Sequence, residues 1–93
     1  MNKKVFDTAD VVALYLGKTF SHKQMPKIKA VVEFLVGNGA NFTYTDKVLH
    51  NKIQNILVKK YEWLGSLRYN HADFENWKDN IIHNHGEELT LSK

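Results

Sequence analysis

The 93-residue sequence predicts a mainly α-helical (α+β) fold, with four short helices followed by a short C-terminal strand. Three observations predict it. Apolar residues recur at i, i+3 and i+4 in four separate segments, which is the period of one helix face. A glycine follows each segment, and glycine adopts the left-handed conformation that ends helices at little cost. The last residues alternate between apolar and polar side chains, as in a strand with one buried face.

The first helix is expected to begin after Asp7 and to end at Gly17. The Asp7 side chain is placed to accept a hydrogen bond from the first turn, and Asp10 follows three residues later at a capping-box position. Val11 and Leu14 lie one helical turn apart and mark the face that packs into the core.

The second helix is expected to begin between Gln24 and Pro26 and to end at Gly37. Proline has no backbone N–H and is tolerated only in the first turn of a helix, so Pro26 marks a start. The dipeptide Asn38-Gly39 after this helix predicts a turn.

The third helix is the longest, with Thr45 as its expected N-cap and Gly65 as its end. Thr43 and Asp46 form a competing capping pair, and the sequence leaves that choice open. Its apolar face repeats with a period of 3.6 residues and comprises Leu49, Ile53, Ile56, Leu57, Tyr61 and Leu64.

The fourth helix is expected to begin between Asn70 and Asp73 and to end at Gly86. Residues 88–91 then predict a strand that buries its two leucines. An isolated strand is unstable, and we expect residues 18–21 to pair with it. The inner face of the fourth helix comprises Phe74, Trp77 and Ile81.

Composition excludes several classes of protein. The chain is long enough for one core, so residues 1–93 are expected to form a single globular domain. The absence of cysteine excludes a disulfide scaffold, a thiolate zinc site and a cysteine nucleophile. No apolar run is long enough to cross a membrane and no secretion signal is present, so a cytoplasmic location is expected. No motif for catalysis or cofactor binding is found, so we predict a non-enzyme with no cofactor.

Histidines near the C-terminus are candidates for a metal or acid/base site. His83 and His85 are two residues apart, which places them roughly 200° apart around a helix, too far to chelate one ion. Histidines near a helix C-terminus also interact favourably with the helix dipole. The sequence therefore predicts no metal site, and it leaves open whether His71 meets the other two in space.

Two surfaces are candidates for binding a macromolecule. The first comprises Tyr61, Trp63, Arg68 and Tyr69, residue types that are enriched in protein-binding hot spots. The alternative for these rings is that they cap the core. The second lies on the third helix, where lysine can neutralise phosphate and asparagine can recognise adenine. Its residues, which would otherwise form an ordinary solvated face, are Lys47, Asn51, Lys52, Asn55 and Lys59.

The order of these signals resembles a family of small bacteriophage- and prophage-encoded proteins of unassigned function. The segments that carry the resemblance are Phe6 and Asp10-Val11-Val12, Gly17-Lys18-Thr19-Phe20, Phe34-Leu35, Phe42-Thr43, Leu57 through Tyr61 to Leu64, Trp77 and Gly86-Glu87-Glu88-Leu89-Thr90-Leu91. Family members carry a histidine where Tyr44 stands and a proline where Glu62 stands, so no role is carried over to these positions. The resemblance implies a phage context, in which small proteins bind and block host proteins, including antiviral defence.

The sequence therefore favours a non-enzymatic binding module, a phage accessory protein that inhibits a host macromolecule by covering its surface. Inhibition of a defence system, as by an anti-CRISPR protein, is one form that this function would take. A small nucleic-acid-binding protein is the first alternative, and an oligomeric protein that sequesters a small ligand is the second. Formation of a homo-oligomer is left open.

Overall fold

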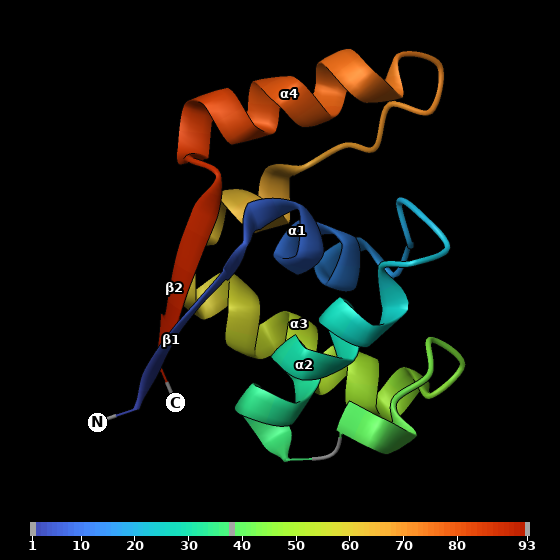
Figure 1. Ribbon diagram of the computed structural model, residues 1–93, viewed down its shortest axis with the longest axis vertical. Coiled ribbons are helices and arrows are strands. Elements are labelled where there is room, and N and C mark those ends of the chain that lie inside the picture. The colour runs from blue at the N-terminus through green and yellow to red at the C-terminus, as the bar shows by residue number, and fades with distance from the viewer. Residues whose placement is uncertain (1, 38, 93) are drawn as a thin grey trace.

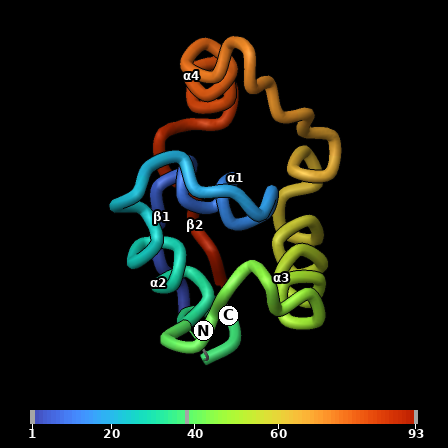
Figure 2. The backbone as a smooth tube through the Cα atoms, turned by 90° about the vertical axis from the view of Figure 1, so that its right-hand side faces the viewer, coloured from blue at the N-terminus to red at the C-terminus, as the bar shows by residue number. Residues whose placement is uncertain are grey.

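The computed structural model describes residues 2–37 and 39–92 of the chain. Within these residues, four α-helices pack with a two-stranded antiparallel sheet that lies along one side of the molecule (Figure 1), which confirms the predicted fold class. Helix α4 crosses one end of the molecule above α1, while α2 and α3 lie on opposite sides below it (Figures 1 and 2). The elements are β1 (Lys3–Asp7), α1 (Thr8–Leu16), α2 (Met25–Val36), the 3₁₀ helix η1 (Gly39–Asn41), α3 (Lys47–Lys60), the 3₁₀ helix η2 (Glu62–Ser66), α4 (Phe74–His85) and β2 (Glu88–Ser92).

Strand β2 forms where the alternation predicted it, but its predicted partner was wrong. It pairs with β1 at the N-terminus, in a register that places Phe6 opposite Leu89, and not with residues 18–21. Phe6, Leu89 and Leu91 are buried on the inner face of the sheet. Only one residue of β1 is buried, so the strand lacks the alternation that would have revealed it. The two strands lie side by side, close to both chain ends (Figure 1).

A single cluster of buried apolar side chains joins the four α-helices, the 3₁₀ helix η2 and both strands. The helices contribute their i, i+3, i+4 faces to it, as the sequence pattern predicted. Burial of these side chains is the main favourable contribution to folding, at roughly 1.5–3 kcal/mol for each fully buried large side chain. The largest members with no more than 1% exposure are Phe42, Leu14, Ile28, Ile53, Leu57, Leu64, Leu91, Val11, Val12, Val31 and Val32.

Three predicted helix ends are confirmed. Gly17 and Gly37 adopt left-handed conformations, with φ of 74° and 71°, directly after α1 and α2. Gly86 follows α4 with φ of 93°. Helix α2 starts at Met25, with Pro26 in its first turn as expected. Asn38, part of the predicted turn after α2, lies outside the described residues.

The predicted end of the third helix was wrong. Helix α3 stops at Lys60, and Tyr61 takes an extended conformation with φ of −138° and ψ of 92°. The Tyr61 hydroxyl donates to the Thr90 carbonyl at 2.7 Å, which ties this break to strand β2. The 3₁₀ helix η2 follows and contains Gly65, and it buries Leu64 completely. The apolar period of α3 continues past Lys60 into η2. Periodicity alone therefore could not reveal that the helix ends at Lys60.

Two predicted caps also differ from the structure. Asp46, not Thr45, is the N-cap of α3, and its carboxylate accepts a hydrogen bond from the Leu49 N–H at 3.1 Å. Asp7 occupies the N-cap of α1 but makes no side-chain capping bond. The chain beyond α4 supplies the acceptor for this turn, since the Thr8 N–H donates to the Glu87 carbonyl at 2.8 Å.

Side chains of α3 satisfy the carbonyl groups at the end of α1. His50 Nε2 lies 2.7 Å from the Leu14 carbonyl oxygen, and Gln54 donates to the Tyr15 carbonyl at 2.8 Å. The last carbonyls of a helix have no partner within it, so these bonds fix the two helices against each other. They also turn the opposite face of α3 toward solvent.

Candidate binding surfaces

Four aromatic rings gather at the surface where the connector after α1, the loop before α4 and α4 itself meet. Phe20 packs edge-on against Phe74 and Trp77, with ring centroids 5.0 and 5.9 Å apart. Tyr69 lies 5.2 Å from Trp77 and 6.1 Å from Phe74. All four are only partly buried. We call Phe20, Tyr69, Phe74 and Trp77 the aromatic cluster.

Two lysines lie over the rings of the aromatic cluster. Lys18 Nζ is 4.8 Å from the centroid of Tyr69, and Lys78 Nζ is 5.5 Å from that of Phe74. Such cation–π contacts contribute roughly 0.5–1 kcal/mol at exposed sites. Lys78 also forms a 3.6 Å ion pair with Glu75, one turn earlier on the helix. The cluster therefore combines exposed ring area with positive charge.

A buried polar pair holds the connector that carries Phe20. Gln24 accepts a hydrogen bond from the Phe20 N–H at 2.6 Å and donates to the Asp10 carboxylate at 2.9 Å. Both Gln24 and Asp10 are more than nine-tenths buried. Burial raises the pKa of the Asp10 carboxyl, and the hydrogen bond from Gln24 offsets part of that rise. The position of Phe20 is thus set by a hydrogen bond from its own backbone.

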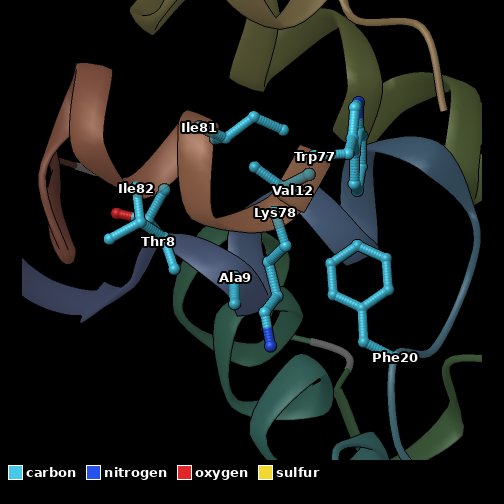
Figure 3. A pocket seen from close by; sticks show the side chains of 8 residues that line it. All are labelled: Thr8, Ala9, Val12, Phe20, Trp77, Lys78, Ile81 and Ile82. Carbon is cyan, nitrogen blue, oxygen red and sulfur yellow. The ribbon is translucent and has the colours of Figure 1, made fainter. Parts of the chain in front are cut away.

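A groove of about 250 Å³ adjoins the aromatic cluster and is lined by Asp7, Asp10 and three lysines, Lys23, Lys27 and Lys78. Figure 3 shows Lys78 and Phe20 side by side at the neighbouring apolar seam between α1 and α4. Small-molecule sites typically enclose about 300–1,000 Å³. The groove is smaller and open, which does not favour the small-ligand alternative.

The structure divides the four residues predicted as a partner surface, with Tyr61 and Trp63 in one place and Tyr69 in another. Tyr69 belongs to the aromatic cluster, whereas Trp63 stacks on His85 with centroids 3.7 Å apart and planes 6° apart. Tyr61 lies beside Trp63, at 6.2 Å. Arg68 donates to the carbonyl of its neighbour Leu67. Trp63 is partly buried against the core, as Phe20 and Trp77 also are, but its ring is in addition stacked on His85. The alternative that a ring caps the core therefore describes Trp63 better.

The sequence analysis did not identify Phe20 and Lys18 as surface residues. It placed Phe74 and Trp77 on the inner face of the fourth helix, and Trp77 does pack against the core while both rings stay partly exposed. Phe20 is 54 residues before Phe74, and no local pattern links the two segments. Crowding of aromatic residues between Tyr61 and Trp77 was the only signal available.

All five residues predicted as a nucleic-acid surface lie exposed on one side of α3. At about 100° per residue they span an arc of roughly 140°. Val48, 83% exposed, lies inside this arc. Gln54 lies outside this arc and donates to the Tyr15 carbonyl at the end of α1. We call Lys47, Val48, Asn51, Lys52, Asn55 and Lys59 the α3 face.

The three C-terminal histidines have separate environments. His85 stacks on Trp63, His71 lies 6.1 Å from Tyr69, and His83 is exposed. Residues 2–37 and 39–92 contain no group of three or more His, Asp or Glu side chains that could hold a metal ion. Within the same residues, no helix has the length and apolar character needed to cross a membrane.

Comparison with protein-family models, with curated proteins and with solved structures returned no match for this chain. The resemblance to a phage family therefore stays a prediction.

Proposed function

We propose that this protein is a non-enzymatic binding module that docks on a host protein through the aromatic cluster. The observation that supports the proposal is the aromatic cluster itself, where four partly exposed rings carry two lysines above their faces. Tyrosine and tryptophan supply large contact area with little conformational entropy to lose, and they are enriched in hot spots. Lysines around the rings favour a partner with acidic residues at the rim of the interface.

Binding alone would inhibit the host protein, because the bound module would cover part of the host protein's surface. A protein interface of standard size covers about 800 Å² of each partner. The exposed surface of this chain is 5840 Å², so such an interface would use about one seventh of it. One face built around the aromatic cluster is therefore large enough to form such an interface. Inhibition by binding requires no chemical reaction. In the phage context implied by the sequence resemblance, the partner is a host protein in the cytoplasm, with antiviral defence the first class to search.

The test is affinity capture from nuclease-treated lysate of the host bacterium, followed by mass spectrometry. The double charge reversal Lys18→Glu and Lys78→Glu should abolish capture of the specific partner, because it replaces the two cations over the rings. The matched control, Lys52→Glu and Lys59→Glu, changes the same number of charges on the α3 face and should capture as wild type does. Thermal unfolding of each variant checks that the fold is kept.

Two results would overturn the proposal. One is equal capture of the partner by wild type and by the Lys18 and Lys78 variant. The other is recovery of nucleic acid, in a parallel capture without nuclease, and of no specific protein.

A further inference from the structure

We infer that the α3 face is a second binding site, which enters the major groove of duplex DNA. This site is distinct from the aromatic cluster and does not depend on the function proposed for it. Three independent features of α3 support the inference: its charge, its shape and the kinds of residue on its exposed side.

The charge of α3 is entirely positive. Lys47–Lys60 contains four lysines and neither aspartate nor glutamate. No α3 lysine forms an ion pair in the part of the chain that the structure describes, residues 2–37 and 39–92. The carboxylate of Asp46 at the start of the helix is engaged by the Leu49 N–H. Glutamate–lysine pairs one turn apart stabilise a solvated helix, and this face has none.

The shape of α3 suits a groove. The helix is held from its other side by Ile53, Leu57 and the His50 bond to α1. From Lys47 to Lys59 the exposed side extends about 18 Å, at 1.5 Å per residue. The major groove of B-DNA, about 12 Å wide, admits an α-helix. Duplex RNA has a deep and narrow major groove, so the geometry favours DNA.

The residues on this side are locally unfavourable choices for an exposed helix. Asn51 and Asn55 are poor helix formers, and Val48 is β-branched and exposes an apolar side chain. Lys47 places a positive charge at the positive end of the helix dipole. Departures from local preference on a solvent face are expected where a surface contacts a ligand.

These residue types correspond to the chemistry of the major groove. Asparagine can accept from N6 and donate to N7 of adenine, and an apolar side chain can contact the thymine methyl group. Lys47, Lys52 and Lys59 lie along the same side and would neutralise phosphates. The site therefore combines phosphate contacts with groups that distinguish A·T from G·C pairs.

The first test measures binding of a fluorescein-labelled DNA duplex by anisotropy between 50 and 200 mM salt. Each phosphate contact contributes about 0.9 to the slope of log affinity against log salt. The triple variant of Lys47, Lys52 and Lys59 to alanine should reduce that slope by about 2.7. The control replaces Lys3, Lys23 and Lys29 with alanine, which removes equal charge from other elements and should leave the slope unchanged.

The second test compares alternating A·T and G·C duplexes. Wild type should prefer the A·T duplex, and Asn51→Ala with Asn55→Ala should bring the ratio of affinities to about 1 without changing the salt slope. Alanine favours helix more than asparagine does, so these variants should keep α3 intact.

Several results would overturn the inference: no DNA binding at 50 mM salt, equal losses in the two lysine variants, binding of duplex RNA as tight as that of DNA, or an affinity ratio that the asparagine variants do not alter. The protein-capture experiment uses the other surface, so failure of one proposal leaves the other to stand on its own result.

Discussion

Gly17 offers the sharpest test of how α1 and α3 are held together. It ends α1 with φ of +74°, and a Cβ added there would lie 2.9 Å from Cε1 of His50. Gly37 ends α2 with φ of +71°, and a Cβ added at that glycine would have no described atom within 4 Å. Substitution by alanine therefore imposes the same backbone strain at both positions but a steric conflict at only one.

The expected costs differ for that reason. A left-handed conformation costs an L-residue about 1–2 kcal/mol. The lower entropy of the unfolded alanine chain offsets about 0.4–1 kcal/mol of this cost. Gly37→Ala should therefore lower the free energy of unfolding by about 1 kcal/mol. Gly17→Ala must also displace His50 from its 2.7 Å contact with the Leu14 carbonyl, which adds about 1–2 kcal/mol.

Urea denaturation followed by tryptophan fluorescence measures both values. The total for Gly17→Ala, about 2–3 kcal/mol, corresponds to a fall in Tm of roughly 8–24 °C for a domain of this size. A double-mutant cycle with His50→Ala isolates the steric part. In the His50→Ala background, Gly17→Ala should cost no more than Gly37→Ala does in the wild type. Equal costs of the two glycine substitutions in the wild type would refute the contact with His50.

Four further predictions concern two buried polar groups, a half-buried tyrosine and one stacked ring. Thr8→Val should lower the free energy of unfolding by about 1–2 kcal/mol in urea denaturation, because the fully buried hydroxyl donates to the Gly86 carbonyl at 2.6 Å. Asp10→Asn should remove part of the pH dependence of the free energy of unfolding. Burial raises the pKa of Asp10 above 3.8 in the folded state, so the wild type gains stability relative to the variant as the pH falls through that pKa toward 3.8. Burial raises the pKa of Tyr44 to about 12, so stability should decline as the pH rises above 10, and Tyr44→Phe should abolish this part of the decline. Trp63→Ala should lower the free energy of unfolding, measured by thermal unfolding, by about 2 kcal/mol, because the ring stacks on His85 and packs on the core.

Each of these predictions has a result that contradicts it. An unchanged stability of Thr8→Val would show that the hydroxyl bond contributes nothing net. Parallel stability–pH curves for wild type and Asp10→Asn, or for wild type and Tyr44→Phe, would show that burial does not shift those pKa values. A Trp63→Ala variant as stable as wild type would restore the ring to the list of free binding residues.

Local chemistry was sufficient to predict the four helices and the C-terminal ends of three of them. Gly17 and Gly37 end α1 and α2 because the left-handed region is open to glycine, and Pro26 marks the first turn of α2 because its ring is tolerated only there. The alternation around Leu89 and Leu91 placed β2 for the same kind of reason, since residues two apart share one face of a strand. The polar side of α3 also followed from its helical period alone.

What the sequence could not decide was which segments meet. Phe6 pairs with Leu89 across 83 residues, and Phe20 reaches Phe74 across 54, and no local pattern encodes either contact. The break at Tyr61 likewise depends on a bond to Thr90 from the far end of the chain. The sequence by itself determined the four α-helices, strand β2 and their buried faces, because propensity, capping and periodicity act within a few residues. Strand β1 and the end of α3 did not follow from it. Only the tertiary structure decided the strand partner and the aromatic cluster, because long-range packing selects among many pairings that local preferences leave equal.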